Sequence, residues 1–561
     1  MTKLVILTLF LFSALPQSSP ITVSQASKPV CIQITAPSVN RTWGYISLLY
    51  DDQFHDPVEV QEEIMRINEL APDLVDLEVI GQSIQGRNIS CVRITNELNT
   101  AQKAKTLVVA QHHGREQITV EAALRFILRM VNGYQSNNYI THYVDTEEIY
   151  VIPMLNPDAL ELVVNNGNHW LRKNLRPYDN DNDTLFDEDP IEDVDGDGHI
   201  SRFSVTSKLN SSNYYVYYEG IDNDADGLVN EDGVGLVDLN RNYFPFWGTV
   251  QAHHQVDSEV YAGTQPFSEP ETRAFRDFAT NHEFAMAYSL HSGINSTWFA
   301  TNENGQYPYP EIYREMLLDL QTILPPAFNP DPGYIPPLHT DTLLNLGQGY
   351  WKDWMVFEQG CIAPMTFEIY HNASSDGPDA YSVFVDNSTH TITEWKGIYG
   401  YFNPEEQFIN DLWRDIRPAF DYLLNMTPRL TIDIESVTGD GNQQNNVEIR
   451  FSVRNLSPHL GTIDTIKLLE ATGSLLASRP ALSAGKNRTD TINLDLSGAA
   501  NPKNYTIQVG NEYIGYTRYM ISFTSGGSSS PAFEYWIPLV LLSLVLLRRR
   551  MHYKRNKGYM N

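Results

Sequence analysis

An apolar run that ends in two histidines and a glutamate constrains this chain more than any other feature. Residues 107–110 read Leu-Val-Val-Ala, the segment 111–116 reads Gln-His-His-Gly-Arg-Glu, and apolar side chains at helical spacing follow over 120–131. A strand followed by a helix puts the polar segment at the carboxyl edge of an α/β sheet, where such sheets place active sites. His113 and Glu116 could both bind one Zn²⁺. A His-x-x-Glu pair alone is more often a surface loop, so the rest of the chain decides.

The order of apolar segments predicts two folded domains in the 561 residues. Between 43 and 425, helices are expected over 57–70 and 120–131, and strands over 74–80, 89–94 and 149–154. This alternation is typical of an α/β fold, with a largely parallel or mixed sheet covered by helices on both faces. Between 429 and 524, apolar and polar residues alternate with period two, which predicts a β-sandwich domain. We find no chemistry in that domain and interpret it as a spacer or adhesion module.

The charge balance and the cysteines exclude two kinds of function. The net charge of −30 argues against nucleic acid as a partner. The cysteines, Cys31, Cys91 and Cys361, form no Cys-x-x-Cys pair. They therefore exclude a thiolate zinc site and allow at most one disulfide.

The two ends of the chain resemble targeting segments. Residues 1–20 have a basic start, an apolar core and a small polar exit, which predicts a signal peptide. After a linker at 525–532, residues 533–548 are apolar up to an arginine cluster, and 549–561 are basic. We interpret them as a single-pass C-terminal transmembrane anchor with a basic cytoplasmic tail; a sorting signal that is cut off is the alternative. The bulk of the chain is expected on the extracellular side of the cell membrane, or secreted if the tail is processed.

Four further polar signals follow in chain order: Arg172 in the basic run 171–174, the segment 238–241 (Asp-Leu-Asn-Arg) at the end of a strand, His291 at another strand end, and Glu368 pointing out of an apolar strand. Together with the His-x-x-Glu pair they resemble the zinc carboxypeptidase family of the carboxypeptidase A/B type.

The resemblance covers about 43–425 and includes the segments 80–87, 156–158 and 261–272. It implies the fold of that family, a mixed eight-stranded sheet between helices.

The resemblance implies a zinc site. His113, Glu116 and His291 would bind one Zn²⁺ and leave its fourth position to a water. Asp238 would orient His113, because a metal-bound imidazole usually donates its other N–H to a carboxylate or carbonyl. Glu368 would take a proton from that water and pass it to the leaving amine.

The resemblance also implies that the site binds peptide C-termini. Arg172 would polarise the scissile carbonyl and stabilise the oxyanion. Asn240 and Arg241 would bind the terminal carboxylate, which suits the bidentate fork of a guanidinium. Arg115 would contribute to the peptide-binding surface. We interpret His112, the neighbour of a ligand, as a bystander.

The sequence departs from the family pattern at several places. His169 stands where the digestive enzymes of the family carry a second arginine, and Asn345 stands near the place of their mobile tyrosine. Tyr350 is the nearest tyrosine, and whether it substitutes is open. Lys352, just before Asp353, would lie at the bottom of the pocket for the terminal side chain, where an ammonium favours a C-terminal Asp or Glu. The alternative is that Lys352 points elsewhere.

An acidic insertion occupies 178–233. Its carboxylates alternate along three stretches: Asp179, Asp181 and Asp183; Asp193, Asp195 and Asp197; and Asp222, Asp224, Asp226 and Glu231. Alternating carboxylates with Gly at the turn bind Ca²⁺ in EF-hand loops, and this pattern resembles thrombospondin type 3 repeats. We expect Ca²⁺ to order the insertion over the active-site rim, because its like charges would otherwise repel. A solvated acidic loop is the alternative.

These observations predict a zinc-dependent metallocarboxypeptidase that removes C-terminal residues from peptides or proteins. Two alternatives remain: a related amidohydrolase acting on non-standard or cell-wall peptides, and a catalytically silent peptide-binding member.

Overall fold

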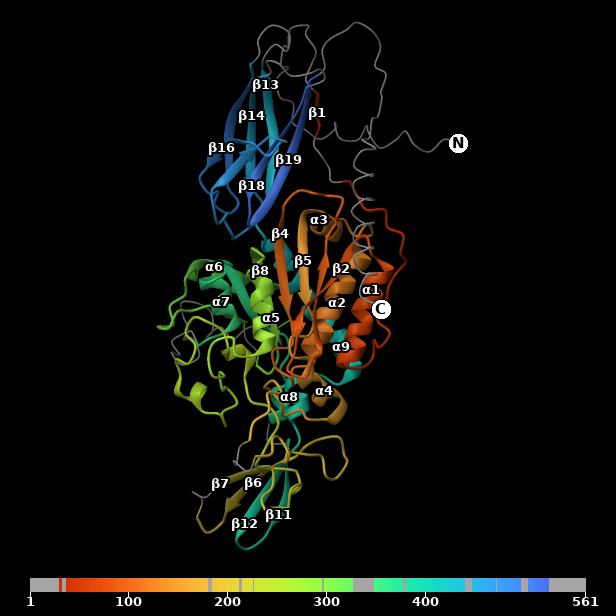
Figure 1. Cartoon of the computed structure of the whole chain (residues 1–561), viewed down its shortest axis with the longest axis vertical. Coiled ribbons are helices and arrows are strands. Elements are labelled where there is room, and N and C mark those ends of the chain that lie inside the picture. The colour runs from red at the N-terminus through yellow and green to blue at the C-terminus, as the bar shows by residue number, and fades with distance from the viewer. Residues whose placement is uncertain are drawn as a thin grey trace.

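The computed structural model describes most of the chain: residues 30–32, 37–179, 184–210, 214–225, 227–294, 297–325, 348–376, 380–438, 446–470, 472–495 and 503–523. The expected signal peptide, linker, C-terminal anchor and basic tail lie outside the described residues. The described residues form an elongated molecule, with a β-rich domain at the top of Figure 1, an α/β domain in the centre and a small sheet at the bottom. Within these residues, none of the helices has the length and hydrophobicity that crossing a membrane requires.

The central domain is built on a mixed sheet, as expected. Its described strands follow the order β2-β3-β5-β4-β8-β10-β9. Their bounds are β2 Val75–Gln82, β3 Asn88–Ile94, β4 Lys103–Val109, β5 Glu147–Ile152, β8 Phe284–His291, β9 Thr297–Phe299 and β10 Ala363–Glu368. The four inner strands β5, β4, β8 and β10 are parallel, and β2, β3 and β9 pair antiparallel at the two edges. The described residues thus give this sheet seven strands, where the family fold implied eight.

Helices cover both faces of this sheet (Figure 1). One face packs against α1 Pro57–Leu70, α2 Ile118–Gly133, α3 Asn138–Thr146, α6 Pro310–Ile323 and α9 Ile409–Met426; the other packs against α5 Pro270–Ala279 and α7 Trp351–Phe357. Alternate side chains of β4 serve the two cores: Val108 packs with the first group, and Leu107 and Val109 pack with the second. Each such buried side chain contributes about 1.5–3 kcal/mol to folding.

Local signals explain where these elements begin. Helix α1 has the expected bounds because Asp56 accepts hydrogen bonds from the backbone N–H groups of Val58 and Glu59, and the Glu59 carboxylate accepts one from Asp56 N. This capping box satisfies the donors that the first turn leaves without partners. The short helices α4 Pro157–Asn166 and α8 Ile398–Phe402 lie near the carboxyl ends of the parallel strands (Figure 1).

The C-terminal domain consists of two antiparallel sheets around an apolar core. One sheet contains β13 Leu430–Thr438, β14 Asn446–Asn455 and β17 Asn487–Asp495; the other contains β15 Ile466–Leu469, β16 Leu475–Arg479, β18 Lys503–Asn511, β19 Ile514–Phe523 and β1 Val30–Ile32. The second sheet continues into the central one, because Ile514 pairs with Ala104 at the start of β4. Ser457 Oγ also donates to Met426 O over 2.8 Å. The two domains are therefore joined by backbone and side-chain bonds.

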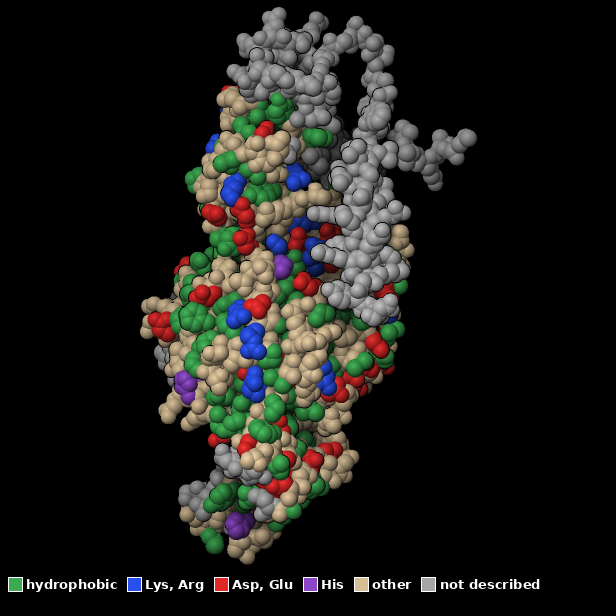
Figure 2. All heavy atoms as spheres, in the orientation of Figure 1, with side chains coloured by type: hydrophobic (Ala, Val, Ile, Leu, Met, Phe, Trp, Pro, Cys, Tyr) green, Lys and Arg blue, Asp and Glu red, His purple; other side chains and the backbone are tan. Residues whose placement is uncertain are grey.

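A four-stranded antiparallel sheet projects from the lower end of the central domain. Its strands, in the order β11-β12-β6-β7, are β6 Arg202–Ser207, β7 Tyr214–Tyr218, β11 Tyr381–Asp386 and β12 His390–Trp395. We call this sheet the wing. Two of its strands come from the acidic insertion, where the sequence predicted calcium-binding loops or a solvated acidic loop. Figure 2 shows hydrophobic and acidic side chains together on this projection.

Candidate metal centre and active site

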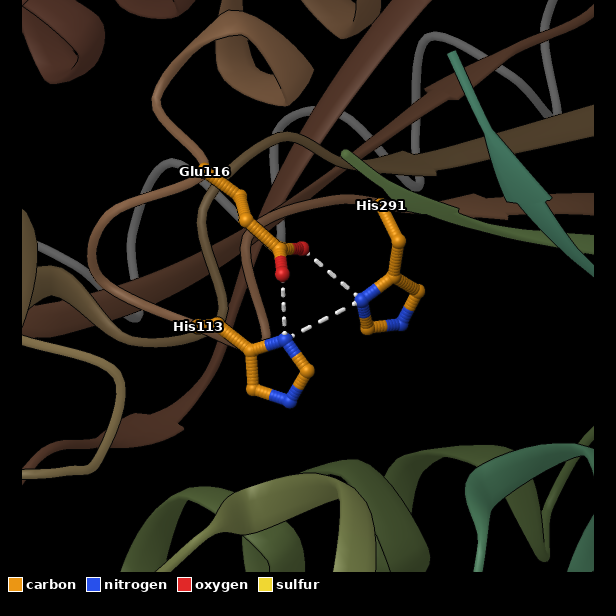
Figure 3. A group of neighbouring side chains, drawn as sticks. All are labelled: His113, Glu116 and His291. Atoms are coloured by element: carbon orange, nitrogen blue, oxygen red, sulfur yellow. Dashed lines mark hydrogen bonds and ion pairs between the residues drawn. The ribbon is translucent and has the colours of Figure 1, made fainter. Parts of the chain in front are cut away.

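Two histidines and a glutamate converge at the carboxyl ends of two neighbouring parallel strands. His113 and Glu116 lie in the turn between β4 and α2, and His291 is the last residue of β8. Nδ1 of His113 lies 2.7 Å from Oε1 of Glu116, and Nδ1 of His291 lies 2.8 Å from Oε2 of Glu116 (Figure 3). One ligand atom of each residue lies within 4.8 Å of the other two. All three side chains are buried.

The turn that carries two of these residues needs a glycine between them. A Cβ at Gly114 would lie 2.8 Å from both Cβ of Ala159 and O of Leu171. The close approach lets Arg115 N donate to Leu171 O over 2.7 Å, and it lets Gly114 N donate to Arg172 O. The turn is thereby fixed against the segment that supplies Arg172.

The protonation states of these groups fit a divalent cation. Burial alone would raise the pKa of Glu116, but the charges and hydrogen bonds of His113 and His291 lower it below the usual carboxyl range. Burial lowers the pKa of His291. One carboxylate with two imidazole nitrogens is a donor set that Zn²⁺ prefers. These three residues could therefore hold one zinc ion.

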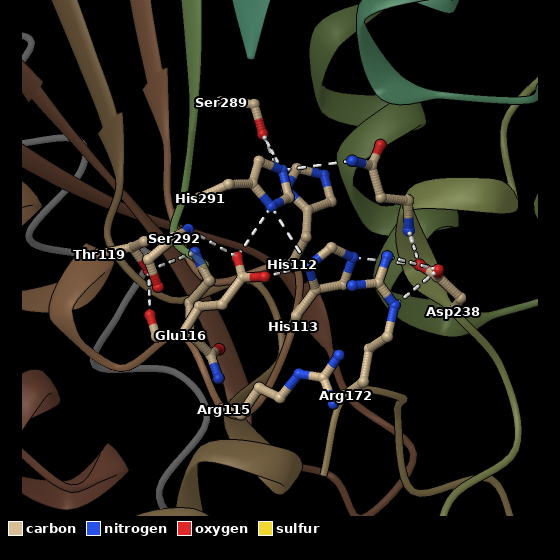
Figure 4. Close-up of polar contacts among 12 residues, drawn as sticks. His112, His113, Arg115, Glu116, Thr119, Arg172, Asp238, Ser289, His291 and Ser292 are labelled. Carbon is tan, nitrogen blue, oxygen red and sulfur yellow. Dashed lines mark hydrogen bonds and ion pairs between the residues drawn. The ribbon is translucent and has the colours of Figure 1, made fainter. Parts of the chain in front are cut away.

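Asp238 connects the metal group to an arginine. Its Oδ1 lies 3.2 Å from Nε2 of His113, and its Oδ2 accepts hydrogen bonds from Nε and Nη2 of Arg172 over 2.9 and 2.8 Å (Figure 4). Burial would raise the pKa of Asp238, but Arg172, Arg241 and His113 hold it well below its usual range. The carboxylate stays charged and contacts both the imidazole and the guanidinium.

Two further residues, Ser289 and His112, lie behind His291, and the sequence had given neither of them a role. Ser289 Oγ lies 3.0 Å from Nε2 of His291 and 3.0 Å from Nδ1 of His112 (Figure 4). The His112 ring stacks on the His291 ring with centroids 5.4 Å apart, and its Nε2 lies 3.2 Å from Oη of Tyr243. His112 thus packs against the ring of a predicted zinc ligand and shares the Ser289 hydroxyl with it. The period of two on β8 could have identified Ser289.

One cavity of about 380 Å³ brings the predicted residues together. Its walls include His113, Arg115, Glu116, Arg172, Asn240, Arg241, His291, Tyr350, Lys352, Glu368, Tyr401 and Phe402. Glu368, the last residue of β10, pairs in register with His291 on β8. Asp238 stands behind the wall. His169 is absent from the wall and packs instead on Tyr399, with ring centroids 4.8 Å apart.

A tyrosine lies between two cations in this cavity. Nζ of Lys352 and Cζ of Arg241 each lie 4.3 Å from the ring centroid of Tyr350. Nζ of Lys352 also lies 2.9 Å from Oδ1 of the buried Asp353. Lys352 therefore lines the cavity. Asn345 lies outside the described residues.

The acidic insertion brings only some of its carboxylates together. Oxygens of Asp193, Asp195 and Glu219 lie within 4.8 Å of one another, and Glu219 was not among the expected ligands. Asp193 accepts from the backbone N–H groups of Gly196, Asp197 and Gly198, and Lys396 Nζ lies 3.6 Å from Asp195 Oδ2. Backbone donors and a lysine thus compensate part of this charge.

The remaining expected calcium ligands are more scattered. Asp222 accepts from Ala225 N and Gly227 N and so closes its own turn. Asp181, Asp183 and Asp226 lie outside the described residues. Asp179, Asp224 and Glu231 do not belong to any close group of metal-binding side chains among the described residues.

Comparison with known proteins gives one family. A family model described as zinc carboxypeptidase matches residues 60–417. A zinc carboxypeptidase of Saccharothrix mutabilis subsp. capreolus is 35% identical over 136 residues, which are 23% of this chain and 30% of the relative. An inactive metallocarboxypeptidase of Saccharomyces cerevisiae is 31% identical over 109 residues, which are 19% of this chain and 25% of the relative. The chain thus spans less than a third of the length of either relative. A crystal structure of thrombin-activatable fibrinolysis inhibitor is 19% identical, with a TM-score of 0.46 over 67% of this chain and 75% of that one.

Proposed function

Because the chain belongs to the zinc carboxypeptidase family, we propose that it is a zinc-dependent metallocarboxypeptidase, which hydrolyses the C-terminal peptide bond of peptides or proteins. The observation that supports this most is that one cavity is lined by the His113–Glu116–His291 group and by Glu368 and Arg172. When bound, zinc supplies a Lewis acid that polarises oxygen atoms of substrate and water.

Glu368 is the proton carrier in this proposal. Burial, and then the negative charge of Glu116, raise the pKa of Glu368 well above the usual carboxyl range. A cation held by Glu116 would offset that charge and lower the pKa of Glu368 from this raised value. A carboxylate with such a pKa can accept a proton from the attacking water and then give it to the leaving amine.

The arginines act on the substrate. Asp238 holds the guanidinium of Arg172 at the cavity wall, where it can stabilise the oxyanion that develops on the scissile carbonyl. Arg241 donates from Nη1 to Asn240 O over 3.0 Å, and both side chains line the cavity. Their amide and guanidinium donors suit a terminal carboxylate. Arg115, whose guanidinium contacts Glu259 and Phe402, borders the path of the peptide.

We also propose a preference for C-terminal Asp or Glu. The support is the position of Lys352 in the cavity wall, beside Arg241 and across the Tyr350 ring. The pairing of Lys352 with Asp353 compensates part of its charge. The protein should therefore release C-terminal Asp or Glu faster than other residues, but not exclusively.

Blocked dipeptides that end in Glu, Lys, Leu or Phe test both proposals. We expect release that a zinc chelator abolishes, with Glu released fastest. Glu368→Gln should lower kcat by about 10²- to 10⁴-fold while zinc content stays unchanged. If Leu or Phe is released fastest, the protein is still a carboxypeptidase but the proposed role of Lys352 is wrong. No release, with zinc shown to be bound, would contradict the proposal in favour of the amidohydrolase or the silent peptide binder.

Two further expectations remain proposals. Calcium binding to the insertion is supported by the group formed by Asp193, Asp195 and Glu219. Selective removal of Ca²⁺ should then speed proteolysis within 178–233, and unchanged proteolysis would contradict it. A location on the extracellular side of the membrane, or secretion, is supported by the sequence of the two ends; fractionation of cells with and without residues 533–548 tests it.

A further inference from the structure

The wing and the insertion 178–233 together expose more large apolar side chains than their share of the described residues. Nearly half of the large hydrophobic side chains that the described residues expose belong to the wing or to the insertion 178–233 around it. On one face of the wing, which we call its outer face, Tyr215, Tyr217 and Phe384 are 63%, 43% and 58% exposed. They surround the buried Phe203, whose ring lies 5.1 Å from that of Tyr217 and 5.0 Å from that of Phe384. Exposed apolar patches of this kind mark interaction sites.

The opposite face of the wing is built onto the wall of the active-site cavity. Trp395 of β12 packs in one apolar cluster with Ile398 and Phe402 of α8, and Phe402 lines the cavity. Arg115, another wall residue, lies over the Phe402 ring at 4.4 Å and donates to Trp170 O over 3.3 Å. The wing is thus continuous with one wall of the cavity, and it projects from the end of the central domain where α8 lies (Figure 1).

Charge decides which kind of chain would bind there. The insertion 178–233 contains 16 Asp and Glu residues against two basic residues, Arg202 and Lys208. Arg202 packs over the Trp395 ring at 4.3 Å, and Lys208 pairs with Asp386, so neither offers a free cation. A surface this acidic repels anionic membranes and acidic peptides and attracts basic ones.

We propose that the outer face of the wing binds the part of a polypeptide substrate that lies upstream of the scissile bond, and that this part carries basic and apolar side chains. The inference rests on the proposed function, because the C-terminus of the same polypeptide must lie in the cavity. The wing then selects polypeptides over dipeptides, and it acts on binding and not on the chemical step.

Two synthetic polypeptides of about 20 residues with the same last two residues test this, one with alternating Lys and Leu upstream and one with alternating Glu and Leu. We expect KM to be about tenfold lower for the Lys/Leu polypeptide, with similar kcat. In the double variant Tyr215→Ser/Phe384→Ser this advantage should fall to about twofold or less, because two exposed aromatic anchors are lost. Hydrolysis of the blocked dipeptide with the same last two residues should change less than twofold.

Tyr139→Ser is the matched control, because Tyr139 is an equally exposed tyrosine, at 62%, on α3 in the central domain. It should leave the KM of both polypeptides unchanged. An equal KM for the two polypeptides in the unaltered protein, or a Lys/Leu advantage that survives the double variant, would overturn the inference.

Binding measured without hydrolysis separates this inference from the proposed function. Fluorescence anisotropy of the labelled Lys/Leu polypeptide on the Glu368→Gln protein should show binding that weakens about tenfold in the double variant and with added salt. If no dipeptide is cleaved but this loss is seen, the proposed function fails and the binding face stands. Two results would overturn the inference. One is a dimer of the unaltered protein that the double variant abolishes, and the other is binding of neutral lipid vesicles instead of the polypeptide.

Discussion

Ser289 Oγ lies 3.0 Å from Nε2 of His291, on the side of the ring that faces away from Glu116. The contact holds the imidazole so that its Nδ1 points at the other two members of the metal group. Partners of this kind typically change metal affinity by about 10- to 100-fold when they are removed.

Ser289→Ala should therefore weaken zinc binding by about 10-fold or more. Competition with a chromophoric chelator measures this directly and does not depend on activity. Ser90→Ala is the control, since Ser90 is likewise a buried strand serine, on β3, bonded to Gln61. Equal zinc affinity in the Ser289 variant and the unaltered protein would show that the contact is only packing.

Asp238→Asn should impair stability and kcat as well as zinc binding. The amide cannot balance the charges of Arg172 and Arg241, whose side chains are 14% and 12% exposed. Breaking a buried ion pair leaves an uncompensated charge, so we expect a loss of about 3 kcal/mol in the free energy of unfolding, read from urea denaturation. Unlike Ser289→Ala, this variant should stay impaired in kcat at saturating zinc, because Arg172 is no longer held in place. Full recovery of kcat with zinc would contradict this.

Gly114→Ala should displace the turn that carries two of the metal-binding residues. A Cβ there would lie 2.8 Å from Leu171 O, which is backbone and cannot move aside cheaply. Overpacking of this kind costs about 1–3 kcal/mol, and we expect zinc affinity to fall with stability. Gly44→Ala is the control, since a Cβ at Gly44 meets nothing within 4 Å. A Gly114 variant as stable as the Gly44 variant would refute the steric argument.

His55 should make the stability of the protein depend on pH. Its Nδ1 lies 2.8 Å from Glu121 Oε1 and its Nε2 lies 3.8 Å from Glu63 Oε1. Burial lowers the pKa of His55, but the hydrogen bond to Glu121 and the negative charges of Glu121 and Glu63 outweigh this effect and raise the pKa to about 9. Because that value exceeds the unfolded value of about 6.5, protonated His55 stabilises the fold fully below about pH 6.5 and loses this effect as pH rises through 9.

The expected loss is about 3 kcal/mol between pH 6 and pH 10. Urea unfolding of the unaltered protein and of His55→Gln at both values measures it, and the variant should lack this part of the pH dependence. An identical pH profile in both proteins would exclude His55 as its origin.

The grouping of the candidate zinc ligands was predictable from the sequence. His113, Glu116 and His291 follow apolar runs, and parallel strands bring such ends to one edge of the sheet. The place of Ser289 beside His291 could be predicted in the same way, because a residue two positions earlier on a strand lies on the same face of the sheet. The contact between His112 and His291 does not follow, since it depends on how two separate strands are packed.

The wing was not predictable for a similar reason. The strands β6 and β7 are short and stand among acidic turns, and their partners β11 and β12 lie more than 150 residues later in the chain. Each pair alone is marginal in water, so its stability comes from the four-stranded arrangement and from the packing of Trp170 against Trp395. Local propensity could indicate the aromatic strand 214–218 but not its place in a sheet.

The pairing of Ile514 with Ala104 has a hydrodynamic consequence. A spacer on a loose linker lets two domains tumble separately, whereas here the second sheet of the sandwich runs into the central sheet. His459 of the sandwich adds contacts of 2.8 Å to Glu315 and 2.6 Å to Asp319 on α6. The two domains should therefore rotate in solution with one correlation time, as a single rod. If the sandwich end of this rod is attached to another structure, the distance and direction of the cavity and the wing from that attachment point are fixed as well.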